Sequence, residues 1–163
     1  MGVRFAEKIH VIPLLAPVET TEAKVSAFVA LENAQWITFL IQTGALATDS
    51  DDQYEITVAS ATGQTTNAND IAIPYKYRLS SAVGTDSWGA ITSATSTGFI
   101  LEATTDGSKA VLIDVDPASI PALDSDALYV YVDIATTTMV SGPVAVSAFI
   151  EPRYPQNSNI SSS

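Results

Sequence analysis

The chain has one histidine, His10, and no cysteine, so a catalytic triad or a histidine-based zinc site would have to use His10. His10 lies in an apolar segment that Pro13 and Pro17 interrupt. The sequence contains no Gly-x-Ser-x-Gly nucleophile turn, no phosphate loop, no Gly-x-Gly-x-x-Gly and no His-Glu-x-x-His motif. These residues predict a protein that is not an enzyme and binds no cofactor, with His10 packed in an arm or an interface.

Four acidic side chains, Asp49, Asp51, Asp52 and Glu55, gather in one polar segment. Oxygen-rich loops of this kind can bind calcium. The spacing differs from that of an EF-hand, because no Gly occupies the sixth loop position and no Glu the twelfth. We therefore interpret the segment as a solvated turn and expect no metal site, with calcium binding as the alternative.

Asp114 and Asp116, followed by Asp124 and Asp126, could form the carboxylate pair of a glycosidase. The sequence around them shows no recognisable aromatic side chains that would line a sugar cleft. We therefore expect these carboxylates to be structural.

Tyrosines alternate with cations at Tyr75, Lys76, Tyr77 and Arg78, a combination that could suggest nucleic-acid binding. In a strand, alternate side chains point to opposite faces, so the tyrosines are expected to pack on one side. Lys76 and Arg78 would then be free on the other side to meet an acidic partner surface.

The overall charge limits the possible partners. With 7 basic and 18 acidic residues, the net charge is −11, which repels phosphate backbones and anionic lipid surfaces. No apolar stretch reaches the roughly 18 residues of a membrane span. We expect neither nucleic acid nor membrane as a partner.

The composition favours strands and self-association. Hydrophobic residues make up 47% of the chain and charged residues 15%, against roughly a quarter charged in an average domain, and the mean hydropathy is +0.23. Ala, Val, Ile, Thr and Ser dominate, whereas helix-forming residues at helical spacing are scarce. Neighbouring subunits are therefore expected to cover part of the surface, which predicts a homo-oligomer.

Short strand-like runs recur about every ten residues and predict one all-β domain, a β-sandwich or jelly-roll-like fold. The run at residues 35–42 is apolar almost throughout, which predicts a central strand with both faces covered. Residues 71–79 alternate as one strand in which Pro74 must lie at an edge or a bulge. One helical turn is expected at residues 117–123, capped by Asp116.

The two ends differ from the middle of the chain. Residues 1–17 are extended and proline-flanked, and we interpret them as an N-terminal arm or edge strand. Residues 18–152 form the sandwich domain, and the Ser-rich residues 153–163 form a flexible tail. The arm is expected to bind a neighbour through its apolar side chains Phe5, Ile9, Val11, Ile12 and Leu14.

Five short motifs in residues 73–155 carry a resemblance to a known group of proteins. They are Ile-Pro-Tyr-Lys-Tyr-Arg-Leu at 73–79, Ser-Trp-Gly-Ala-Ile-Thr at 87–92, Gly-Phe-Ile-Leu at 98–101, Val-Leu-Ile-Asp-Val-Asp-Pro at 111–117 and Glu-Pro-Arg-Tyr-Pro at 151–155. Together they resemble small structural proteins of tailed bacteriophages and prophages, such as the head decoration (capsid cement) proteins. The resemblance spans residues 71–155, about half of the chain.

The resemblance implies a β-rich accessory protein, often trimeric, that sits at junctions between capsomers and stabilises the head. Its partner would be the major capsid protein, and its location the capsid surface of a virion assembled in a bacterial cytoplasm. A tail, neck or fibre-base subunit is the runner-up. A carbohydrate-binding module or glycan hydrolase is the alternative from a different class.

Overall fold

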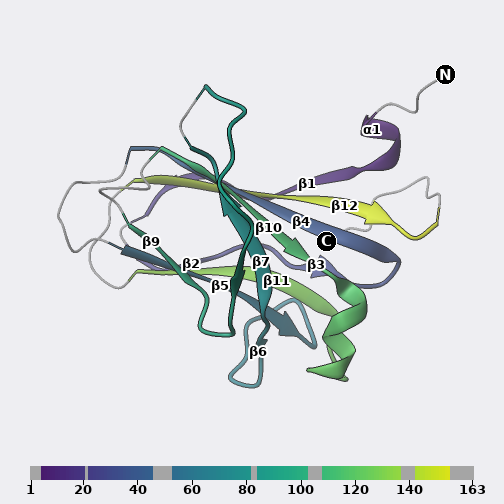
Figure 1. The fold of residues 1–163 in the computed structure, drawn as a ribbon. Helices are drawn as coiled ribbons and strands as arrows, with labels where there is room; N and C mark the ends of the chain where they lie inside the picture. Colours follow the sequence, from purple (N-terminus) through teal and green to yellow (C-terminus); the bar gives the residue numbers. More distant parts are fainter. Residues whose placement is uncertain are drawn as a thin grey trace.

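The structure is a computed structural model that describes residues 5–20, 22–45, 53–81, 84–102, 108–136 and 142–154. Two antiparallel sheets pack face to face and form a sandwich (Figure 1). The predicted all-β sandwich is confirmed, whereas its jelly-roll topology stays a prediction. The segment with Asp49, Asp51 and Asp52 and the tail beyond Tyr154 lie outside the described residues.

Sheet A is the upper layer in Figure 1 and has six strands, with every neighbouring pair antiparallel. In spatial order these are β1 (His10–Glu19), β12 (Pro143–Pro152), β4 (Ala34–Thr43), β10 (Ala110–Val115), β7 (Tyr75–Leu79) and β8 (Thr92–Ala94). The short helix α1 (Phe5–Lys8) precedes β1 and lies at one end of this layer.

Sheet B is the lower layer in Figure 1. Its main path runs β2 (Lys24–Val25), β11 (Tyr129–Thr136), β5 (Gln53–Ala61) and β6 (Ile71–Ala72). Two further strands join it, with β3 (Val29–Ala30) paired to β11 and β9 (Phe99–Glu102) paired to β5. A 3₁₀ helix, η1 (Pro117–Ala122), links β10 of sheet A to β11 of sheet B.

The core lies between the sheets because side chains alternate along each strand. On β12, Val146, Ala148 and Ile150 point inward and are fully buried, while the residues between them face outward. From sheet B, Tyr54 and Ile56 meet them in one continuous core cluster. The Tyr54 hydroxyl is satisfied by a hydrogen bond with the hydroxyl of the buried Thr20.

The sequence predicted either an arm or an edge strand for the N-terminal segment, and the structure shows an edge strand. β1 pairs with β12 along residues 10–19, and its Leu14 is only 6% exposed in the domain's own core. The backbone carbonyl of Leu14 also accepts a hydrogen bond of 2.9 Å from the Ala27 N–H, which ties this edge to the segment between β2 and β3. Residues 10–17 are therefore part of the sandwich and not a separate arm.

The strand β4 differs from its prediction in one respect. It is central, since it lies between β12 and β10, and its inward side chains Ile37, Phe39 and Ile41 are fully buried. Its outer face is not covered, and Trp36 there is 41% exposed. The expectation that both faces are covered is wrong for the single chain, because the outward side chains of β4 are exposed or only partly buried.

Residues 71–79 form two strands and not one. β6 belongs to sheet B and β7 to sheet A, and the chain crosses between the layers at Ile73 and Pro74. The proline thus stands where no ladder hydrogen bond is needed. The Asp116 cap of η1 is confirmed, since its side chain accepts a hydrogen bond of 2.9 Å from the Ala118 N–H.

Candidate partner-binding surface

The structure places five of the seven predicted partner-binding residues on the outer side of sheet A. Phe5 on α1 is 61% exposed and Val11 on β1 is 45% exposed, while Ile9 joins the two elements and lines a groove on the same side. Lys76 and Arg78 lie farther across the same face, on β7.

The remaining two predicted residues, Ile12 and Leu14, do not face a partner. Ile12 pairs with Ala148 on the inner side of the ladder and packs against the core, and Leu14 is buried in it. For these two residues, the expectation of partner binding is wrong. The physical reason is strand alternation, since Ile12 and Leu14 share the inner phase of β1 and Val11 has the outer one.

Aromatic packing holds the α1 end of this surface in place. The rings of Phe5 and Phe149 meet edge to face with centroids 6.0 Å apart, a favourable geometry for aromatic pairs. The Ile9 N–H donates a hydrogen bond of 2.9 Å to the Phe5 carbonyl and closes the turn of α1. We call Phe5, Ile9, Val11 and Phe149 the docking strip.

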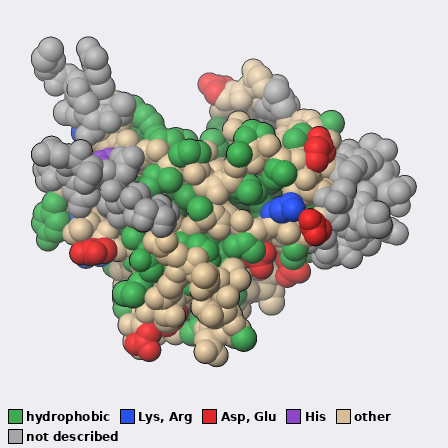
Figure 2. All heavy atoms as spheres, turned by 180° about the vertical axis from the view of Figure 1, so that it is seen from behind, with side chains coloured by type: hydrophobic (Ala, Val, Ile, Leu, Met, Phe, Trp, Pro, Cys, Tyr) green, Lys and Arg blue, Asp and Glu red, His purple; other side chains and the backbone are tan. Residues whose placement is uncertain are grey.

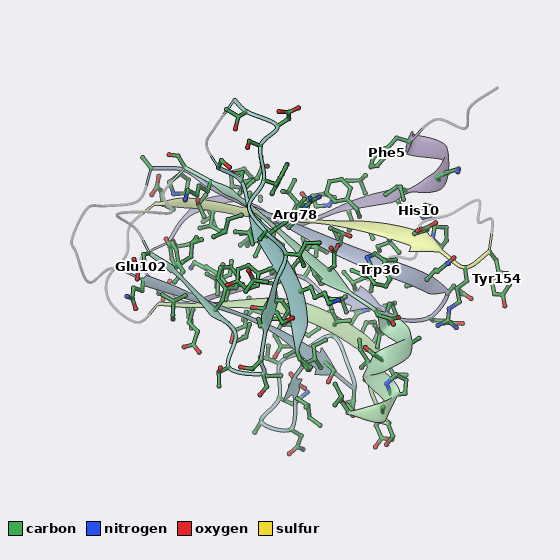
Figure 3. The ribbon with its side chains drawn as sticks, in the orientation of Figure 1. Phe5, His10, Trp36, Arg78, Glu102 and Tyr154 are labelled. Atoms are coloured by element: carbon green, nitrogen blue, oxygen red, sulfur yellow. The ribbon has the colours of Figure 1, made fainter. Side chains whose placement is uncertain are left out.

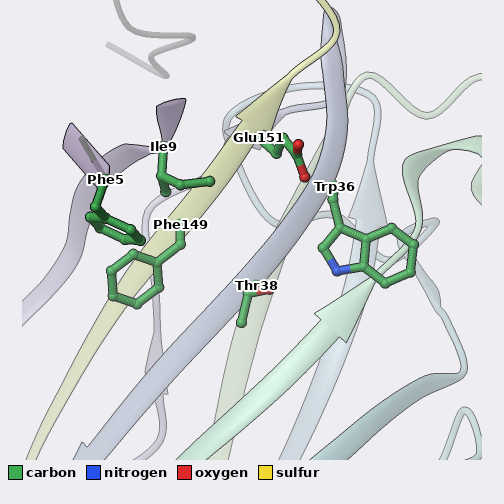
Figure 4. Close-up of a pocket in the computed structure, with 6 residues that line it drawn as sticks. All are labelled: Phe5, Ile9, Trp36, Thr38, Phe149 and Glu151. Carbon is green, nitrogen blue, oxygen red and sulfur yellow. The ribbon is translucent and has the colours of Figure 1, made fainter. Parts of the chain in front are cut away.

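An open groove of about 380 Å³ runs beside the docking strip. Phe5, Ile9 and Phe149 line one side, and Trp36, Thr38 and Glu151 line the other (Figure 4). Phe5 and Trp36 both lie toward the α1 end of sheet A, whereas Glu102 lies at the opposite end of the molecule (Figure 3). Most of the groove wall is apolar, so water leaves it at little cost when a partner binds.

The strand register explains why these residues share one surface. Val11 pairs with Phe149, Phe149 with Thr38, and Thr38 with Asp114, so one row of side chains crosses from β1 to β10 on the outer face. In the next row, Leu40 pairs with Leu112, and both are only partly buried. The row order places apolar side chains toward β1 and cations toward β7.

The predicted separation of tyrosines and cations is confirmed. Tyr75 is buried and Tyr77 packs against the core, while Lys76 is exposed on the opposite face. The Arg78 guanidinium lies 5.1 Å from the centre of the Trp88 ring, within cation–π range. Arg78 is thus held by an aromatic neighbour, whereas Lys76 forms no ion pair in the described part of the chain.

The outer face of sheet B has a different character. Glu55 and Asp133 lie half-buried on its neighbouring strands β5 and β11. Burial, together with the negative charge of Glu55, raises the pKa of Asp133 above its ordinary value. Burial and a hydrogen bond of 3.1 Å to Asp70 raise the pKa of Tyr131 to about 12. The two outer faces therefore differ, since sheet A carries the docking strip and the cations of β7 as well as carboxylates, whereas sheet B carries the half-buried pair of Glu55 and Asp133.

His10, which was considered for catalysis, is not among the residues that line the pocket of Asp114 and Asp116. The Nδ1 atom of His10 is buried without a hydrogen-bond partner among the described residues, and His10 lies opposite Ile150 at the end of the ladder. Glu55 lies on β5, between the buried Tyr54 and Ile56. No group of three or more His, Asp or Glu side chains within the described ranges is arranged to hold a metal ion.

One functional neighbourhood was missed by the sequence reasoning. An aromatic side chain does lie beside Asp114 and Asp116, because Trp36 lines the same pocket as these two carboxylates. Trp36 is far from both in sequence, and only the pairing of β4 with β10 brings them together. The available signal in the sequence was the tryptophan at the start of an apolar strand, but a strand pattern does not show which residues lie next to that tryptophan in space.

Neither helix in the described part of the chain has the length and apolar character needed to cross a membrane. Comparisons with family models, with curated proteins and with solved structures find no match to this chain.

Proposed function

We propose that this chain is a non-enzymatic virion structural protein, a decoration (cement) protein that binds the major capsid protein and stabilises the phage head. The observation that carries the proposal is the outer face of β4 and its neighbours, where Trp36, Phe5 and Val11 are exposed and the other two residues of the docking strip are only partly buried. Soluble monomers rarely leave a contiguous apolar patch of this kind uncovered. The motif resemblance to phage head proteins supports a capsid surface as the partner.

The docking strip can supply useful binding energy. Full burial of an exposed Phe, Ile or Val side chain contributes roughly 1.5–3 kcal/mol. The side chains of the docking strip are already partly buried in the free protein, so binding a partner can bury only the remainder of each. Three of them therefore contribute a few kcal/mol at most, from which ordering costs must be subtracted. A single copy would bind weakly, which is why we also propose a homotrimer: three strips that engage together raise the apparent affinity by about 10²–10⁴.

The direct test compares two matched substitutions on opposite faces. Val11 on the edge strand β1 is 45% exposed, and Ile100 on β9, which pairs only with β5, is 42% exposed on the outer face of sheet B. We expect Val11→Asp to lower binding to undecorated heads by at least about tenfold, because the charge would be desolvated at the interface. Ile100→Asp should change binding by less than about twofold. Cosedimentation of each protein with heads measures both effects.

Thermal unfolding of both variants checks that the fold is retained. If Val11→Asp fails to fold, Phe5→Asp replaces it, since Phe5 lies outside the sheet and is 61% exposed. Equal binding of wild-type, Val11→Asp and Phe5→Asp proteins to heads would contradict the proposal. Binding to purified tails in place of heads would favour the tail, neck or fibre-base alternative.

A further inference from the structure

A second pocket opens on the other side of Trp36 from the docking strip. It encloses about 360 Å³ and is lined by side chains of β4, β7, β8, β10 and η1. The Trp36 indole points away from Phe5 and Phe149 (Figure 4), and Trp36 contributes to the walls of both pockets. The polar side chains of this second pocket are those of Lys76, Ser93, Asp114, Asp116 and Ser119.

The two carboxylates are fixed before any ligand arrives. Asp114 accepts a hydrogen bond of 2.8 Å at Oδ1 from the Thr38 hydroxyl. Asp116 accepts one of 2.9 Å at Oδ1 from the Ala118 N–H at the start of η1. In each case the second oxygen, Oδ2, has no hydrogen-bond partner among the described residues. Each carboxylate thus keeps one acceptor oxygen available in a set orientation.

Lys76 lines the same pocket as the two carboxylates but forms no ion pair with them in the described structure. Lys76 pairs with Asp114 in the β7–β10 ladder, yet no ion pair within 4.0 Å forms between them in the described structure. Tyr75 lines the pocket as well, but its hydroxyl already donates to the Ile56 carbonyl. The Ser119 hydroxyl likewise donates a hydrogen bond of 2.7 Å to the Asp116 carbonyl. The polar groups left for a ligand are therefore the carboxylate acceptors, the ammonium donors of Lys76 and the hydroxyl of Ser93.

This combination fits one chemical class best. A phosphate or a carboxylate ligand would be repelled by Asp114 and Asp116. An organic cation would be attracted by these two carboxylates, although Lys76 offsets one of their charges, so a cationic ligand is the competing class that the experiment below includes. A neutral sugar offers hydroxyl groups that both donate and accept, together with a face of C–H groups that suits the electron-rich face of an indole. The volume lies near the lower end of ordinary ligand sites, roughly 300–1,000 Å³, which suits one or two sugar rings.

We propose that the pocket formed by Trp36, Lys76, Asp114 and Asp116 binds a neutral saccharide, with the ring stacked on Trp36 and its hydroxyls held by the two carboxylates and the ammonium group. The binding is non-catalytic, and the pocket lies on the other side of Trp36 from the docking strip. A virion protein with such a site would hold glycans at the particle surface.

The test uses the fact that the chain has only two tryptophans, Trp36 and Trp88. In the Trp88→Phe variant, fluorescence reports on Trp36 alone. The probes are four neutral disaccharides, namely cellobiose, maltose, lactose and N,N′-diacetylchitobiose, titrated to about 20 mM, well above a dissociation constant on the order of 1 mM. We expect at least one of them to change the emission saturably, and calorimetry on the wild-type protein should report the same affinity.

Two substitutions locate the binding. Asp114→Asn keeps the shape of the side chain but weakens an acceptor, and we expect the affinity to fall at least about tenfold. Asp126→Asn, at an exposed carboxylate outside the pocket, serves as the matched control and should leave the affinity unchanged. In the Trp36→Phe variant, the emission of Trp88 should not respond to the sugar.

The proposal is overturned if none of the four disaccharides binds the wild-type protein, or if Asp114→Asn binds them as tightly as wild type. It is also overturned if arginine methyl ester binds and the sugars do not, because the pocket would then take a cationic side chain. Failure of head binding is a separate result: Asp114→Asn should attach to heads normally, and Val11→Asp should bind the sugar normally.

Discussion

The pKa of Asp133 is determined by the residues around it. It is half-buried on β11, and both desolvation and the charge of Glu55 disfavour its ionised form, so its pKa is raised in the folded state. A carboxyl with a raised folded-state pKa favours folding while it is protonated, and that contribution is lost as the pH rises through the raised pKa. At neutral pH the ionised side chain therefore works against the fold, though partial solvent exposure keeps the effect small.

We expect Asp133→Asn to raise the melting temperature at pH 7, because the amide removes the buried charge without changing the size of the side chain. Below the ordinary pKa of an aspartate, wild type is protonated too, so the difference between the two proteins should vanish. Melting curves from pH 3 to pH 8 would check this. A lower melting temperature of the variant at pH 7 would show that the charged form is stabilised by a contact instead.

At the scale of the element, β1 combines a structural and a binding face within a few residues. Leu14 is 6% exposed and Val11 is 45% exposed on the same strand. We expect Leu14→Ala to lower the free energy of unfolding by about 2–5 kcal/mol, the usual cost of such a core truncation. Val11→Ala should cost about 1 kcal/mol or less. Chemical denaturation of both variants measures these differences, and equal costs would mean that β1 does not contribute to the core.

The inward-facing residues could be predicted wherever inward and outward side chains alternate along a whole strand without a register shift. In β12 the alternation of Val144, Val146 and Ala148 with outward residues marks the inner face without ambiguity. In β1 the same alternation separates Val11 from Ile12 and Leu14, whereas the register shifts beyond Pro13 place Leu15 opposite the inward Val146. Ile12 and Leu14 were misplaced because the segment was interpreted as an arm that binds a neighbour through all of its apolar side chains, and not as a strand with two faces.

Long-range placement was also beyond the sequence pattern. Residues 71–79 alternate without interruption, yet the first part joins one sheet and the second part the other, since alternation describes a strand and not its neighbours. The same limit applies to the pocket, because Trp36 and Asp114 are brought together by the register of β4 and β10. Apolar residues on both faces of β4 correctly indicated a central strand, but they could not show that the outer face of β4 stays partly exposed in the single chain.

For the whole molecule, charge and hydropathy act in opposite directions on self-association. The net charge of −11 makes copies repel one another, while the apolar surface of sheet A favours contact. Hydrophobic and uncharged groups also make up most of the surface in Figure 2, with acidic groups scattered singly across it. Salt weakens the repulsion, since the Debye length falls from about 10 Å at 0.1 M to about 3 Å at 1 M.

We therefore expect purified protein to form an oligomer, a trimer as the first choice, whose association strengthens as the salt concentration rises. Light scattering at micromolar concentration in about 0.1 M and 1 M sodium chloride would measure the mass at both salt concentrations. A clean monomer of 17.1 kDa in both would contradict self-association without a capsid.

The position of β12 has a consequence for how the protein is made. This strand lies between β1 and β4, and it is synthesised after every other strand of the sandwich. Roughly 100 residues separate the end of β4 from the start of β12, which a ribosome adds in about 5–20 s at roughly 5–20 residues per second. During that interval Phe39 and Ile41 have no partner strand on that side. Sheet A can therefore close only once translation has passed β12, and a nascent chain stalled before residue 143 should remain a substrate for chaperones.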